Sequence, residues 1–239
     1  MLNLLLAEAA LETVPKPLWN HPSVAKRAKA LCKKPGETLL DRSYHHHAMV
    51  RLEDDMQRGR PDIVHFALLE ALGTPLNKEK LLRVYVHTVD NHVIYIDPQV
   101  RLPRNYDRFV GLVEQLYKKG KVPVKGHPLL KLKEESLENL ISEIKPSYVI
   151  AFTRKGEMKT LKDAMRPFLG QGNFVAIIGA FPQGHFSSET IKLADTSVSI
   201  DPEMLETWIV TSRVIYEFER LVGLPEKRCN KKHPRRQEK

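Results

Sequence analysis

The sequence predicts an α/β protein in which helices flank both faces of a mainly parallel sheet. Three observations predict this fold class. Short apolar segments alternate with segments of helical periodicity along almost all of the 239 residues. Hydrophobic residues make up 42% and charged residues 28% of the chain, as in soluble globular proteins. The length is sufficient for one large domain with a sizeable core.

The first half of the chain contains four predicted strands and two predicted helices. Pro61 suits the first turn of a helix and Gly73 its end, while Asn105 is a good helix cap. The turn at residues 89–91 joins two strands. We therefore expect strands at residues 2–8, 37–40, 82–88 and 92–96, and helices at residues 61–72 and about 105–118. Residues 41–49 are expected to be the extended end of the second strand.

The second half follows a connector, residues 119–128, which contains two glycines and two prolines. Ser187 is expected to cap a short helix. Asp201 and Pro202 form a start signal for the last helix, with Asp201 as its N-cap. We expect strands at residues 129–132, 147–152, 173–178 and 196–200, and helices at residues 136–144, about 159–166 and about 202–221.

Two glycines, Gly179 and Gly184, bound the loop that follows the apolar strand at residues 173–178. Glycine lets the backbone approach a ligand closely, and loops that follow parallel strands meet at one edge of the sheet. The spacing alone is weak, because an ordinary tight turn has it too. Together with the segment after residue 196, this loop predicts a site for a small cofactor.

Several motifs occur in a fixed order along the chain. They are LDRSYHHHAM at residues 40–49, RPDIVH at 60–65, YVHT at 85–88, RLPRNYDRF at 101–109 and GAFPQG at 179–184. With these motifs the chain resembles the nucleolar essential protein family, the small-subunit rRNA pseudouridine-N1-methyltransferases of the SPOUT superfamily, in its short archaeal form. The match covers roughly residues 1–224. The resemblance implies a C-terminal trefoil knot, a homodimer, S-adenosylmethionine as methyl donor and small-subunit rRNA as substrate.

The resemblance also assigns cofactor-binding residues to three segments. They are Phe152, Thr153, Gly179, Gly184, Val198, Ser199, Ile200, Asp201, Pro202, Glu203, Met204 and Leu205. The run that begins at Thr153 differs from the pattern expected of the family. Met204 and Leu205 have the helical spacing of core residues, and in this family apolar side chains of that segment also enclose the adenine.

Three arginines surround the start of the helix expected at residues 105–118. The helix macrodipole is positive there and disfavours each nearby cation by about 0.3–1 kcal/mol. Arg101, Arg104 and Arg108 therefore indicate a bound anion, and we expect at least two of them to bind RNA phosphate. The alternative, which accounts for one of the three, is an ion pair with a nearby carboxylate: Asp97, Asp107 or Glu114.

Arg60 and Asp62 flank Pro61 at the start of another helix. An ion pair that complements the helix dipole explains them as well as a catalytic role does. The resemblance favours catalysis, with Arg60 bound to the target nucleotide of the RNA and Asp62 orienting Arg60.

A metal site is not expected. Neighbouring side chains of an extended segment point to opposite faces, so His45, His46 and His47 do not converge on one ion. We expect them in a packed polar turn near the RNA. Cys32 and Cys229 have neither metal-ligand nor disulfide-framework spacing, which favours a reducing cytoplasm. No stretch is apolar and long enough for a membrane span.

The formal net charge of +9 is unevenly distributed. Residues 226–239 contain seven Lys or Arg and two Glu, which leaves +5 there and +4 on the rest. We expect one domain, residues 1–224, whose first half carries the RNA-binding elements and whose second half, from about residue 129, holds the cofactor. A basic tail, residues 225–239, follows and adds salt-dependent affinity for a polyanion.

The predicted function is methylation of N1 of a pseudouridine in small-subunit rRNA during ribosome biogenesis, with small-subunit ribosomal proteins as further partners. One alternative is a non-catalytic RNA-binding assembly factor that keeps the fold. Another is a SPOUT enzyme that acts on tRNA.

Overall fold

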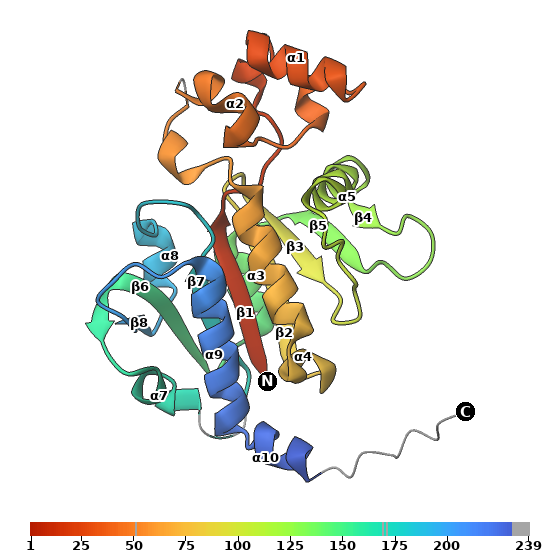
Figure 1. The fold of residues 1–239 in the computed structure, drawn as a ribbon. Helices are drawn as coiled ribbons and strands as arrows, with labels where there is room; N and C mark the ends of the chain where they lie inside the picture. The colour runs from red at the N-terminus through yellow and green to blue at the C-terminus, as the bar shows by residue number, and fades with distance from the viewer. Residues whose placement is uncertain (51, 169, 171, 231–239) are drawn as a thin grey trace.

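A computed structural model describes residues 1–50, 52–168, 170 and 172–230 (Figure 1). A single eight-stranded sheet has the order β4-β5-β3-β2-β1-β7-β6-β8. The strands are β1 (Leu2–Ala9), β2 (Leu82–Thr88), β3 (His92–Ile96), β4 (Lys121–Val122), β5 (Leu130–Glu134), β6 (Tyr148–Met158), β7 (Phe174–Gly179) and β8 (Thr196–Ser199). The five strands β2, β1, β7, β6 and β8, which are neighbours in that order in the sheet, all pair in parallel. β3, β5 and β4 add an antiparallel edge next to β2. The predicted fold class is confirmed.

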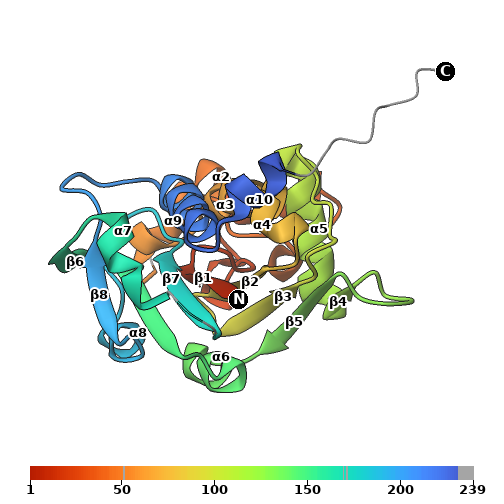
Figure 2. The same ribbon diagram turned by 90° about the horizontal axis from the view of Figure 1, so that it is seen from below.

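Helices lie on both faces of the sheet (Figure 2). One face carries α3 (Pro61–Gly73), α4 (Pro75–Lys78), α5 (Tyr106–Lys119), α7 (Leu161–Ala164), α9 (Thr207–Leu221) and α10 (Leu224–Cys229), and the other carries α6 (Leu137–Ile144) and α8 (Ser188–Lys192). Leu4 and Leu6 of β1 pack towards the first layer, whereas Leu5 and Ala7 belong to a second core cluster. Burial on both faces explains why β1 is an unbroken apolar run.

A smaller helical part lies beyond the carboxyl end of β1 (Figure 1). It consists of η1 (Lys16–Leu18), α1 (Pro22–Ala30), η2 (Pro35–Glu37), α2 (Arg42–Met49) and η3 (Asp55–Gln57). Residues 37–40 form no strand of the sheet, because Leu39 makes only an isolated bridge to Thr13. Residues 41–49 are not extended either. The Asp41 carboxylate accepts the Ser43 N–H at 2.8 Å and caps α2. Ala48 and Met49 of this helix pack inside a third core cluster.

The last long helix begins later than predicted. Asp201 is not its N-cap, since the Asp201 carboxylate instead accepts the Glu203 N–H at 3.0 Å within a turn and α9 starts at Thr207. Residues 200–206 are therefore a loop. The helix expected at residues 159–166 is also shorter, because β6 continues to Met158 and α7 covers only Leu161–Ala164. The caps predicted at Asn105 and Ser187 are confirmed.

The basic tail begins with a helix. α10 covers Leu224–Cys229, and residues 231–239 of the predicted tail lie outside the described residues. Among the helices that the structure describes, none combines the length and the apolar character that a bilayer span requires.

The chain crosses over β8 at Gly156. Val198 of β8 pairs with Phe152 and again with Glu157, so the residues between these two pass across the strand. A Cβ atom at Gly156 would lie 2.5 Å from the Ser197 carbonyl carbon and 2.6 Å from that of Val198. Only glycine allows this approach. The trefoil knot implied by the resemblance stays a prediction.

Candidate functional site

The carboxyl ends of β6, β7 and β8 meet at one edge of the parallel sheet, where two adjoining hollows lie. The two hollows share residues from β6, from the loop before α9 and from the first turn of α9: Phe152, Thr153, Arg154, Met204, Leu205 and Val210. The first also contains Val198, Ser199, Ile200, Asp201 and Glu203, and the second contains Gly179, Gly184 and the loop between them. Ligands of open α/β sheets bind at this edge.

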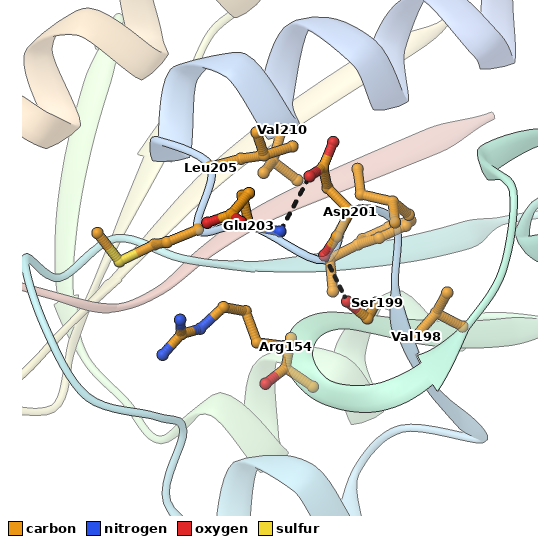
Figure 3. A pocket seen from close by; sticks show the side chains of 11 residues that line it. Arg154, Val198, Ser199, Asp201, Glu203, Leu205 and Val210 are labelled. Atoms are coloured by element: carbon orange, nitrogen blue, oxygen red, sulfur yellow. Dashed lines mark hydrogen bonds between the residues drawn. The ribbon is translucent and has the colours of Figure 1, made fainter.

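The structure thus brings together nearly all the predicted cofactor residues. Pro202 is the exception, because it lines neither hollow. Met204 and Leu205 belong to the loop before α9, so they are wall residues rather than helix core residues. Figure 3 shows Leu205 and Val210 on one side of the first hollow and Arg154 on the other.

The glycine loop of the second hollow is anchored at both ends. The Thr207 hydroxyl donates to the Gly179 carbonyl at 2.8 Å, and the Gln57 amide donates to the His185 carbonyl at 3.4 Å. Gly184 has φ +95°, in the region that other residues avoid. These contacts fix the two ends of the loop in place.

The loop at residues 200–206 is fixed by Asp201. The Ser199 hydroxyl donates to the Asp201 carbonyl at 3.0 Å (Figure 3). Arg213 lies 3.5 Å from the Asp201 carboxylate. Asp201 is thus a structural support of the first hollow.

The chemistry of the two hollows suits a molecule with a flat apolar group and a polar part. Phe152, Ile178, Leu205 and Val210 supply apolar walls. Arg154 and the loop backbone supply charge and hydrogen-bonding groups. Partial burial lowers the pKa of His185 at the rim, and the nearby cations Lys155 and Arg154 lower it further.

A third hollow lies among the starts of α2, α3 and α5. It is lined by Arg42, Ser43, His46, Arg60, Asp62 and Tyr106. Arg60 forms a bidentate ion pair with Asp62, with N–O distances of 2.8 and 2.7 Å. This pairing raises the pKa of Arg60. Three helix N-termini at one place make its potential positive, as an anionic substrate requires.

Tyr106 and Asp41 hold two of these helices together. The Tyr106 hydroxyl donates to the Asp41 carboxylate at 2.6 Å while Asp41 caps α2. Burial raises the pKa of Tyr106, and the Asp41 carboxylate adds to this shift. The start of α2, with Arg42 and His46, is thereby fixed against the start of α5.

The three predicted RNA-binding arginines lie exposed around the start of α5. Among the described residues, Arg101, Arg104 and Arg108 form no ion pair. Of the alternative partners, Asp97 accepts from His127 at 3.1 Å and Glu114 pairs with Lys33. Within the part of the chain that the structure describes, an ion pair therefore explains none of these three arginines.

The cofactor hollows and the third hollow adjoin each other. Glu206 lines the second hollow, and its charge contributes to the raised pKa of Arg60. Phe66 of α3 contacts Trp208 of α9, with ring centroids 5.3 Å apart. The start of α3, which carries Arg60, therefore lies close to the start of α9.

Sequence reasoning missed several lining residues. Arg42 was missed because residues 41–49 were expected to be extended; the Asp41-x-Ser43 cap signal could have revealed α2. His46 was expected near the RNA but in a turn, and Tyr106 was missed although its helix was predicted. Glu206 was missed because a single charged residue in a loop carries no pattern.

The fold and the three hollows define an α/β protein that holds a small ligand beside an anion-binding surface. The profile of the EMG1/NEP1 methyltransferase family matches residues 4–219. The chain belongs to this family, as its motifs predicted.

Relatives and a solved structure agree with this assignment. Ribosomal RNA small subunit methyltransferase Nep1 of Staphylothermus marinus is 46% identical over 224 residues, which cover 93% of this chain and 97% of that protein. The Thermococcus kodakarensis protein of the same name is 45% identical over 94% of this chain and 100% of its own length. The crystal structure of Archaeoglobus fulgidus Nep1 bound to S-adenosylhomocysteine matches with a TM-score of 0.81 and 36% identity, over 92% of this chain and 98% of that one.

Proposed function

We propose that this protein transfers the methyl group of S-adenosylmethionine to N1 of a pseudouridine in small-subunit rRNA. The observation that carries the proposal is the cofactor hollow at the ends of β6, β7 and β8, placed next to the Arg60–Asp62 pair. The Nep1 relatives are named as small-subunit rRNA methyltransferases, and the A. fulgidus structure holds S-adenosylhomocysteine, the product of methyl transfer from S-adenosylmethionine.

The residues of the hollows fit the cofactor. Phe152, Ile178, Leu205 and Val210 provide the apolar surfaces that an adenine needs, and the preformed glycine loop lets backbone groups approach closely. S-adenosylmethionine supplies an electrophilic methyl group on a sulfonium. Because the sulfonium already activates that group, the protein's main task is to position the nucleobase nitrogen.

Arg60 is the residue that we assign to nucleobase positioning. Asp62 binds two of its five N–H groups, and the remaining donors face the third hollow. These donors can reach a base carbonyl oxygen. Arg60 donates one hydrogen bond to each Asp62 oxygen, so we assign Asp62 the orientation of the guanidinium rather than the role of general base.

Arg101, Arg104 and Arg108 bind the RNA backbone in this proposal. They are exposed, unpaired within the described part of the chain, and placed at the positive end of α5. The protein acts as a homodimer. The exposed free thiols of Cys32 and Cys229 are consistent with the reducing cytoplasm.

The test uses S-adenosylmethionine with a labelled methyl group and two RNA hairpins that differ only in pseudouridine or uridine at one position. We expect label only on the pseudouridine hairpin. Equal labelling of both hairpins would refute the N1 specificity. Absence of labelling together with absence of cofactor binding in calorimetry would support the non-catalytic assembly factor instead, and preferential labelling of tRNA in competition would support the tRNA enzyme.

A further inference from the structure

A separate cavity of about 480 Å³ lies on the side of the sheet that carries α6 and α8. Its walls come from five places: the end of β1, the turn between β2 and β3, the region of η3, the start of α6, and α8 with the residue before it. Walls from so many segments form a bowl rather than a groove. A volume within roughly 300–1,000 Å³ is typical of small-molecule sites.

The cavity is acidic in a protein that is otherwise basic. Four carboxylates line it, from Glu8, Asp54, Glu138 and Glu189, and no Lys or Arg does. Within the described part of the chain, none of the four forms an ion pair. The whole chain has a net charge of +9, so this cluster of carboxylates is not the result of an acidic overall composition.

A buried histidine in the wall points to a ligand independently. His87 is 6% exposed, and its Nε2 donates to the Asn91 side-chain oxygen at 3.2 Å. Its Nδ1 is buried without a partner among the described residues. Burial lowers the pKa of His87, so the ring is neutral near pH 7 and Nδ1 is a bare acceptor. An unsatisfied buried acceptor costs about 1–3 kcal/mol unless a donor reaches it.

Backbone strain concentrates around the same cavity. Among the described residues, six that are not glycine have a left-handed backbone, and three of them line this cavity: Glu8 at φ 51°, Asp54 at 52° and Asn91 at 57°. Such a conformation costs a long side chain such as that of Glu8 about 1–2 kcal/mol. Strain of this kind persists where surrounding contacts hold it, and it clusters at ligand sites.

The four carboxylates and Nδ1 of His87 all accept hydrogen bonds, which defines the ligand. A bound metal ion would require three or more convergent ligating side chains, and the described residues contain no such group. An anion is excluded by the four carboxylates. What remains is an organic cation with several N–H donors.

We propose that this cavity binds a small organic polyamine. Its ammonium groups neutralise the carboxylates of Glu8, Asp54, Glu138 and Glu189, and one of them donates to Nδ1 of His87. The site is distinct from the cofactor hollows. It lies against the segment that follows the glycine loop, because Glu8 accepts hydrogen bonds from the Ser187 N–H at 3.0 Å and the Ser187 hydroxyl at 2.7 Å. The proposal does not depend on the proposed methylation.

The test is calorimetric titration of the full chain with spermidine at about 0.1 M salt, where charges beyond about 10 Å are screened. We expect one site per chain. The double variant Glu138→Gln, Glu189→Gln should bind spermidine at least about tenfold more weakly. Both side chains are exposed, so the variant should keep its fold, which its thermal unfolding midpoint checks.

The matched control is Glu134→Gln, Glu226→Gln. It changes the net charge by the same amount at two exposed glutamates outside the cavity, and it should keep the affinity of the unchanged chain. Three results would overturn the proposal. They are equal weakening in both double variants, tighter binding of a trilysine peptide than of spermidine, and Mg²⁺ at equal ionic strength displacing spermidine completely.

Discussion

The Arg60–Asp62 pair tests how much of the activity depends on the orientation of one guanidinium. Asp62→Asn keeps the size of the side chain but removes its charge and weakens both hydrogen bonds of 2.8 and 2.7 Å. We expect the kcat/KM of methyl transfer to fall at least tenfold, measured with the pseudouridine hairpin. The pair is partly exposed, so the unfolding free energy should change by no more than about 1 kcal/mol. A large loss of stability with unchanged kcat/KM would show a purely structural pair.

A substitution at Arg104 tests the proposed RNA-binding surface. Arg104→Ala should weaken RNA binding and reduce the slope of log affinity against log salt by about one unit, because one phosphate contact is lost. Cofactor affinity should not change. The control is Arg83→Ala, an exposed arginine of β2 that lines none of the hollows described above. An equal loss of RNA affinity in both variants would indicate general charge attraction.

A substitution at His45 tests how the free energy of unfolding depends on pH. Its buried Nδ1 accepts the Asp41 N–H at 3.1 Å, and burial lowers its pKa below the usual 6.5. The unfolded chain therefore binds this proton more readily, so His45 contributes stability above about pH 6.5 that is lost as the pH falls through its lowered pKa. In His45→Asn the side-chain oxygen replaces Nδ1. We expect urea unfolding to show a smaller loss of stability between pH 7.5 and 5 in this variant.

At the scale of elements, the crossing of β6 over β8 depends on Gly156. Gly156→Ala places a Cβ within 2.6 Å of β8 backbone atoms that cannot move aside. We expect a lower thermal unfolding midpoint and weaker binding of S-adenosylhomocysteine, since Thr153 and Arg154 lie just before the crossing.

The control for this change is Gly111→Ala in the middle of α5, where a Cβ meets nothing within 4 Å. Alanine should raise the unfolding free energy there by about 0.5–1 kcal/mol, because glycine weakens a helix interior. Equal effects of the two substitutions would mean that the crossing is not tight.

The elements with strong local signals were predictable from the sequence, and those with long-range causes were not. Pro61 with Gly73, and Asn105, marked α3 and α5 because their caps are local. α2 was missed because its inward face, Ala48 and Met49, packs on distant residues of the same small cluster. The start of α9 was misplaced because the Asp201 turn uses the same hydrogen bond as a helix cap. The crossing at Gly156 has no signal in periodicity at all.

At the scale of the whole molecule, α3 and α9 present an apolar face that supports the proposed homodimer. Phe66 is 50% exposed and Tyr216 is 57% exposed, and Ile209 lies two turns from Tyr216 on the same side of α9. A cluster of exposed large apolar side chains on adjoining helices is typical of an interface.

Tyr216→Asp should therefore shift the protein to a monomer in sedimentation analysis, because a charge would be buried without a partner. Val124→Asp, at a 46% exposed site in the loop after β4, is the control and should leave the sedimentation coefficient unchanged. A Tyr216→Asp protein that sediments like the unchanged chain would remove this face from the interface.

The central position of β1 has a consequence for synthesis. β1 pairs with β2 on one side and with β7 on the other, and the Phe174 N–H donates to the Met1 carbonyl at 3.0 Å. During translation β1 is made before both of its neighbours, and β7 is complete only when residue 179 has been added. Until β7 is made, one edge of this apolar strand has no partner, and an unpaired apolar edge favours aggregation of incomplete chains.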